Sequence, residues 1–224
     1  MAWRGVRLAV LLIIAGVLAT LVVWSAPWRE PLGGGPAPRN PDVARVEQYR
    51  REGNLEALAG ESENPRAEVA MRAVQAMGSL GPAAVPHLER RIADARPEVR
   101  EAAVVAWGRA AGDLRPEAVA VAAAAREDKS AIVRATAVSV LGQVRAVNEM
   151  ETLIAALDDP DRMVRVRASA SIERILGRRY EVYLDDPPGS DRRREAVENV
   201  RKIWAEVGQG ARDYYAAKKA AGER

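Results

Sequence analysis

Four segments of the chain align on a valine, and this repetition constrains the fold more than any other feature of the sequence. The aligned residues are Val69, Val99, Val133 and Val164. Successive valines lie 30, 34 and 31 residues apart. A period of this length is typical of repeat architectures, in which one unit cannot bury its apolar side alone. The sequence therefore predicts a stack of similar units that share one continuous core.

Apolar side chains follow each valine at helical spacing. An alanine stands four residues later and a large apolar residue eight residues later; they are Ala73, Ala103, Ala137 and Ala168, then Met77, Trp107, Leu141 and Ile172. These positions share one face of a helix, so each segment predicts a helix with a buried stripe. A glycine follows in three copies as Gly78, Gly108 and Gly142, and Glu173 replaces it in the last. We expect this glycine to end or loosen the helix and to allow close approach of a neighbouring backbone.

A second apolar-periodic segment separates successive copies. These segments contain Val85, Leu88 and Ile92; Ala118, Val119, Ala122 and Ala125; and Val147, Met150, Leu153 and Leu157. Each repeat is therefore predicted to be a pair of helices. Aromatic residues make up only 4% of the chain and phenylalanine is absent, a composition that favours helices packed through small side chains. The predicted fold class is all-α.

An acidic residue and an arginine recur six residues apart in three copies. The pairs are Asp94 and Arg100, Asp128 and Arg134, and Asp159 and Arg165, whereas the first copy has Asn64 and Ala70. This pattern resembles HEAT repeats. Two segments resemble the phycobilisome-lyase subtype of these repeats in particular: ADARPEVREAAVVAWGRAAGD and DDPDRMVRVRASASIERILG. The resemblance covers about residues 54–177 and implies an α-α superhelix, a HEAT-like solenoid of helix pairs.

The resemblance also implies a role for the paired residues. In that family the aspartate of the turn and the arginine of the second helix hydrogen-bond from copy to copy, so these six side chains are expected to form a structural ladder. We prefer this role to a phosphate-binding stripe, because an arginine held by carboxylates is not free for a ligand. The first copy lacks both partners, as terminal repeats are often atypical.

The N-terminal segment predicts a single transmembrane helix. No charged residue occurs from Leu8 to Trp28, and this length reaches roughly 30 Å as a helix. Tryptophans flank the segment as they do at membrane interfaces. A cleaved signal peptide is the alternative, but Pro27 after Ala26 makes a poor cleavage site. We expect a single-pass inner or plasma membrane protein with a cytoplasmic N-terminus and an extracytoplasmic repeat domain.

Four regions follow from these patterns. They are an anchor over 1–28, a linker rich in proline and glycine over 29–41, a HEAT-like repeat domain over 42–207, and a charged C-terminal tail over 208–224. The repeat domain is expected to close with a loop around 185–189 and a helix from about 190 to 207.

Catalytic and cofactor motifs are missing from the sequence. His87 is the only histidine and there is no cysteine, which excludes multi-histidine and thiolate metal sites. No phosphate loop or nucleophile elbow occurs. The net charge of +3 comes from 34 basic and 31 acidic residues that alternate along the chain, which is unlike a nucleic-acid groove. We therefore expect no enzyme, no cofactor and no small-molecule or nucleic-acid partner.

The remaining candidate for function is a surface. In HEAT stacks the second helices line the concave side, and outward positions there are expected to bind a protein partner. The candidate residues are Arg72, Val105, Ala106, Thr136, Ser139, Val140 and Arg167. The alternative is that some of them are half-buried stacking contacts. The leading function is thus a membrane-anchored scaffold, with a bilin lyase-related enzyme or subunit and a structural subunit of a membrane assembly as alternatives.

Overall fold

The computed structural model describes residues 40–112, 117–187 and 189–222. The chain divides into two units, Met1–Pro38 and Arg39–Arg224, and all described residues belong to the second. The predicted anchor and almost all of the predicted linker lie outside the described residues. Within the described ranges, no helix combines the length and the apolar character that crossing a membrane requires.

The described residues form a stack of helix pairs. The second helices of the pairs are α4 (Ala67–Met77), α6 (Pro97–Ala111), α8 (Ala131–Gln143) and α10 (Arg162–Leu176). The first helices are α3 (Leu55–Glu61), α5 (Val85–Ile92), α7 (Val119–Glu127) and α9 (Met150–Ala155), with 3-10 turns at Pro82–Ala84, Val147–Glu149 and Ala156–Asp158. Two further helices, α2 (Pro41–Glu52) and α11 (Asp191–Ala221), precede and follow the pairs.

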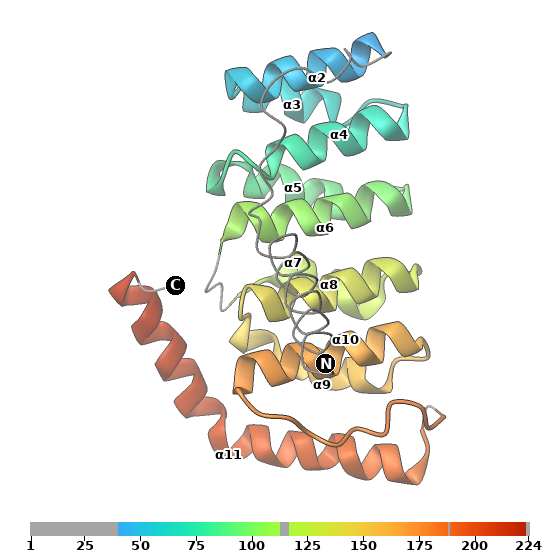
Figure 1. Cartoon of the computed structure of the whole chain (residues 1–224), viewed down its shortest axis with the longest axis vertical. Helices are drawn as coiled ribbons and strands as arrows, with labels where there is room; N and C mark the ends of the chain where they lie inside the picture. The colour runs from blue at the N-terminus through green and yellow to red at the C-terminus, as the bar shows by residue number, and fades with distance from the viewer. Residues whose placement is uncertain (1–39, 113–116, 188, 223–224) are drawn as a thin grey trace, which may run out of the picture. The chain divides into compact units, whose positions relative to one another are not determined.

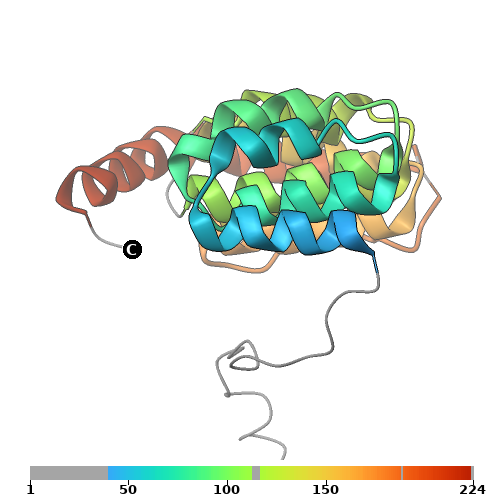
Figure 2. The same ribbon diagram turned by 90° about the horizontal axis from the view of Figure 1, so that it is seen from above.

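The helices lie in two layers. In Figure 1 the second helices follow one another down the front of the stack below α2, and the first helices lie behind them. The view along the stack in Figure 2 shows the two layers side by side. The expected all-α solenoid of helix pairs is therefore observed over the described residues.

The core lies between the two layers and is built from the repeated positions. All four aligned valines are buried, as are the alanines and the large apolar residues that follow them. The predicted inward stripe of the second helices is thus confirmed. One position of the first helices differs from expectation, because Val119 begins α7 and its side chain is 71% exposed, while Val121 is buried instead.

Neighbouring second helices touch at the repeated glycine. A Cβ atom added to Gly78 would lie 2.9 Å from the Cα of Ala106, one added to Gly108 would lie 2.8 Å from Val140, and one added to Gly142 would lie 2.4 Å from the Oγ of Ser171. Positions are counted from the aligned valine of each repeat. Each contact then joins position +9 of one repeat to position +7 of the next. The expected close approach is therefore observed. Only Gly78 follows the end of its helix, since Gly108 and Gly142 lie inside α6 and α8.

The last copy has Glu173 in place of this glycine for a structural reason. Among the described residues no second helix follows α10, so position +9 there does not have to meet the backbone of a neighbouring second helix. Instead, a loop leads from α10 to α11, whose residues Val200 and Trp204 join the core. The boundary expected at 207/208 has no counterpart, because α11 continues to Ala221. Figure 1 shows that α11 changes direction along its length and that its C-terminal half runs past the end of α10.

We predict that Gly142→Ala destabilises the stack. The new Cβ would stand 2.5 Å from the Cβ and 2.8 Å from the Cα of Ser171, so no side-chain rotation relieves the overlap. Overpacking of this kind costs about 1 to 3 kcal/mol of unfolding free energy, measurable by urea denaturation. Gly60→Ala in α3 is the matched control, since its Cβ would meet nothing within 4 Å. A control variant that loses as much stability would contradict this explanation.

Candidate functional site

Each second helix begins after the same hydrogen-bonded turn. The side chain of the turn residue accepts a hydrogen bond from the backbone N–H two residues later, at 2.8 to 3.0 Å, in all four copies. The accepting residues are Asn64, Asp94, Asp128 and Asp159. This arrangement is an Asx turn, for which short side-chain acceptors are suited. It fixes the side chain of each turn residue, a carboxylate in the last three copies, beside the start of its second helix.

Arg100 and Arg134 join neighbouring repeats through these turns. The Nε and Nη2 of Arg100 donate to the two carboxylate oxygens of Asp128 at 2.6 and 2.8 Å. Arg134 donates in the same way to Asp159 at 2.8 and 2.9 Å. In both arginines Nη1 donates to the carbonyl of the turn residue six positions earlier, at 3.0 and 2.9 Å. Each guanidinium therefore ties its own turn to the next one.

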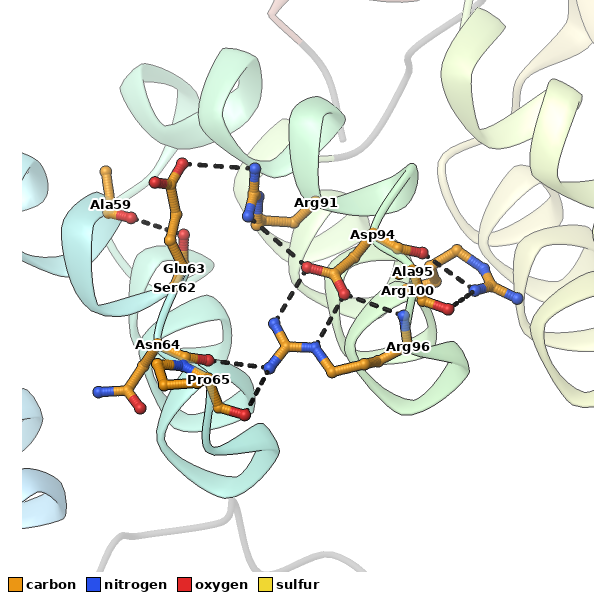
Figure 3. A network of polar contacts seen from close by, with 10 residues as sticks. All are labelled: Ala59, Ser62, Glu63, Asn64, Pro65, Arg91, Asp94, Ala95, Arg96 and Arg100. Atoms are coloured by element: carbon orange, nitrogen blue, oxygen red, sulfur yellow. Dashed lines mark hydrogen bonds and ion pairs between the residues drawn. The ribbon is translucent and has the colours of Figure 1, made fainter.

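A different arginine completes the pattern at the first copy, where Ala70 replaces the expected one. Figure 3 shows Arg96 lying between the first two turns. Its Nε and Nη2 donate to the carboxylate of Asp94 at 2.9 and 3.1 Å. Its Nη1 donates to the carbonyls of Asn64 and Pro65 at 2.8 and 3.4 Å. These carbonyls correspond to those that Arg100 and Arg134 contact within their own repeats, so Arg96 reaches backwards to make the missing link.

Arginines favour the ionised form of two turn carboxylates, those of Asp94 and Asp128. The hydrogen bond from Arg96 is the main cause that lowers the pKa of Asp94, and partial burial opposes it. For Asp128 burial alone would raise the pKa, but hydrogen bonds from Arg100 and from the backbone of Ser130 outweigh it, so the pKa is lowered overall. Charged pairs that are held in this way by forked hydrogen bonds are occupied by protein groups, not open to a ligand.

The series ends at Arg165, because no further repeat follows among the described residues to supply a turn aspartate. Its Nε and Nη2 donate to the backbone carbonyl of Leu184 at 3.1 and 2.9 Å, and Nη1 donates to the carbonyls of Asp159 and Pro160. Burial and the nearby charge of Arg193 lower the pKa of Arg165. The loop before α11 thus occupies the place where another turn would lie. Arg193 itself is fully buried, and its Nε has no partner among the described residues.

The candidate partner-binding residues do not form one exposed surface. Arg72 and Val105 are exposed, and Ser139 and Arg167 are half-buried. The expectation is wrong for the other three, Ala106, Thr136 and Val140, which are buried. Ala106 and Val140 are the residues that pack on Gly78 and Gly108. They are stacking contacts, the alternative that the sequence left open.

Helical geometry explains the error and locates exposed residues that the sequence analysis missed. At about 100° per residue, position +7 lies only about 20° from the buried valine, whereas position +6 lies about 160° from the buried alanine at +4. The residue before each valine also points outward. In the last two copies this residue is Ile132 and Met163, which are 58% and 52% exposed. A helical-wheel angle computed from the aligned valines would have found both.

We predict that Arg134→Ala lowers the unfolding free energy by about 1 to 3 kcal/mol, because it removes the arginine donors from the mostly buried carboxylate of Asp159 and from the carbonyl of Asp128. Arg72→Ala is the matched control, an exposed arginine on a second helix, and is expected to change stability by less than about 0.5 kcal/mol. Denaturant unfolding of both variants measures the difference. Equal effects would show that the link between turns contributes nothing.

We also predict that Asp94→Asn reduces the loss of stability at acidic pH. The folded pKa of Asp94 is lowered from its ordinary 3.8, so its contribution is present above that value and disappears as the pH falls through the folded pKa. Asparagine cannot titrate but can keep the turn, as Asn64 does in the first copy. Thermal midpoints from about pH 6 to about pH 2 should therefore fall less in the variant than in the wild type. Parallel curves would contradict the assignment.

Comparison with known proteins agrees with this geometry. A search of curated proteins finds no match. The family model that describes HEAT repeats matches residues 52–142, which contain the first three helix pairs and the links through Arg96 and Arg100. The match identifies HEAT repeats in general and does not distinguish the phycobilisome-lyase subtype. The stacked pairs, the linked turns and this match together support a HEAT-repeat protein.

Proposed function

We propose that the protein is a non-enzymatic, membrane-anchored scaffold that binds a protein partner across its second helices. The general role follows from the HEAT repeats, since such repeats commonly mediate protein interactions. The finer proposal concerns the outward side chains of α4, α6, α8 and α10. We call this surface the second-helix face and define it by Arg72, Val105, Ile132, Ser139, Met163 and Arg167.

One observation carries the proposal: the exposed position before the aligned valine changes character along the stack. It is acidic in the first two copies, Glu68 and Glu98, and apolar in the last two, Ile132 and Met163. Val105, which is 42% exposed, adds an apolar side chain from α6, the helix that packs beside α8. Apolar side chains exposed on adjacent helices with a charged border are typical of interaction sites. These side chains fit a partner whose apolar segment lies over Val105, Ile132 and Met163 and whose basic residues lie beside Glu68 and Glu98.

Polar contacts join the second helices to one another at this face and just beneath it. The Oγ1 of Thr136 lies 3.3 Å from a carboxylate oxygen of Glu101, and Arg167 lies 3.5 Å from the Oγ of Ser139. Side chains held in this way lose less conformational freedom when a partner binds. The face is therefore suited to recognise a partner without rearranging.

The proposal of a membrane anchor is based on the sequence alone. The 21 residues from Leu8 to Trp28 carry no charge and are long enough for a bilayer core. Arg4 and Arg7 precede them, which favours a cytoplasmic N-terminus and an extracytoplasmic repeat domain. A linker with four prolines between 31 and 41 would hold the repeats away from the membrane.

We predict that replacing both Ile132 and Met163 by glutamate abolishes partner capture in native membranes. Two charges would enter a contact that must lose its water on binding. Crosslinking followed by mass spectrometry of the wild type and the variant measures capture, and both should remain with the membrane after alkaline washing. The thermal midpoint should not change, because both side chains are more than half exposed.

Val119→Glu is the matched control, because Val119 is an exposed apolar residue on the opposite layer of helices. It should capture the same partners as the wild type. Retained capture by the double variant would refute the second-helix face as the binding site. Release of the wild type by the alkaline wash would refute the anchor alone.

A further inference from the structure

A cleft separates the end of α10 from the C-terminal half of α11. It has a volume of about 670 Å³ and is lined by both helices and by the start of the loop that joins them. Tyr215 ties the two walls together, since its hydroxyl donates to the carbonyl of Ile175 at 2.7 Å. Figure 1 shows that α11 leaves the stack at this place. The cleft therefore lies outside the second-helix face, at the last repeat.

The floor of the cleft is apolar and aromatic. Ile175 and Leu176 contribute from α10, and Val207 and Tyr214, both exposed, contribute from α11. The rings of Tyr214 and Tyr215 pack edge to face with their centroids 5.1 Å apart. Exposed aromatic and aliphatic side chains that border a concavity are typical of binding sites for large apolar side chains.

The rim of the cleft is basic. Arg174 and Arg178 line it, and among the described residues neither guanidinium has a carboxylate partner. Arg178 instead donates to the hydroxyl of Tyr180 at 2.8 Å. The one acidic residue in the lining, Glu206, stands on α11. In contrast to the arginines between the turns, these two keep donors that can hold a carboxylate from outside the chain.

We propose that this cleft binds an acidic segment of a partner protein that carries one large apolar side chain. The apolar side chain fills the space between Leu176 and Tyr214, and carboxylates beside it meet Arg174 and Arg178. The charge of the rim selects for an acidic segment against a basic one. The inference names a second contact for the partner of the proposed scaffold, and in that sense it rests on the proposed function.

A larger side chain at position 210 is expected to fill the cleft without destabilising the fold. Gly210 lines the cleft from inside α11, and a Cβ added there would meet nothing within 4 Å. Leucine at this position would project into the space that the apolar side chain requires. It should also keep or raise the thermal midpoint, because glycine inside a helix costs up to about 1 kcal/mol relative to good helix formers.

The test uses the full chain in nanodiscs and a fluorescein-labelled peptide with one tryptophan between two pairs of glutamates in a glycine-serine frame. Fluorescence anisotropy should detect binding of this peptide, and at least about tenfold weaker binding when lysines replace its glutamates or alanine replaces its tryptophan. Gly210→Leu should weaken binding of the acidic peptide by at least about tenfold, and so should Arg174→Glu combined with Arg178→Glu. Gly60→Leu, at another open helical glycine, should bind as the wild type does.

The cleft proposal would be overturned by equal binding of the acidic and basic peptides, by full binding of the acidic peptide to Gly210→Leu, or by no binding of the acidic peptide to the wild type. The second-helix face is judged separately. If the peptide does not bind while the Ile132 and Met163 double variant still loses its partner, the cleft proposal fails and the proposed function stands. If the peptide binds as described while that double variant keeps its partner, the second-helix face fails and the cleft stands.

Discussion

The forked hydrogen bonds between an arginine and the next turn are the interaction on which the rest of the stack depends. Apolar contacts alone would let neighbouring helices slide, because they are not directional. A guanidinium that donates to a carboxylate at 2.6 and 2.8 Å, as Arg100 does to Asp128, accepts little displacement. The Asx turn fixes that carboxylate to the start of its own helix. Each repeat is thereby set in register with the next.

The contacts at the repeated glycine depend on this register. Gly142 must face Ser171, and a shift by one residue would place a larger side chain there. The close approach of the second helices in turn decides which side chains remain on the surface. Position +7 is buried against the glycine of the preceding repeat, whereas Val105 and Met163 stay exposed. The interaction surface is therefore a consequence of how the repeats are spaced, not an independent feature of the sequence.

The sequence predicted the repeats because periodic burial leaves a periodic pattern. The aligned valines and the arginines at 100 and 134 could be read directly, since each recurs in the copies. Arg96 could not be recognised in this way, because it makes the same contacts from a different position and in one copy alone. The course of α11 beyond Val207 was missed because its apolar pattern weakens there, and its helix is held by contacts such as Tyr215 to Ile175 that link distant parts of the chain.

The link between turns is completed differently at the two ends of the stack, and this asymmetry bears on function. At the first end Arg96 reaches back to the turn at Asn64, so the link is complete within the repeats. At the last end the Nε and Nη2 of Arg165 donate to the carbonyl of Leu184 in place of a turn carboxylate, and Arg193, which is buried, donates to the same carbonyl. The loop and α11, which cover this end, do not repeat the sequence pattern of the helix pairs. The C-terminal half of α11 therefore does not pack as another repeat would, and the cleft beside Tyr214 lies between it and the end of α10.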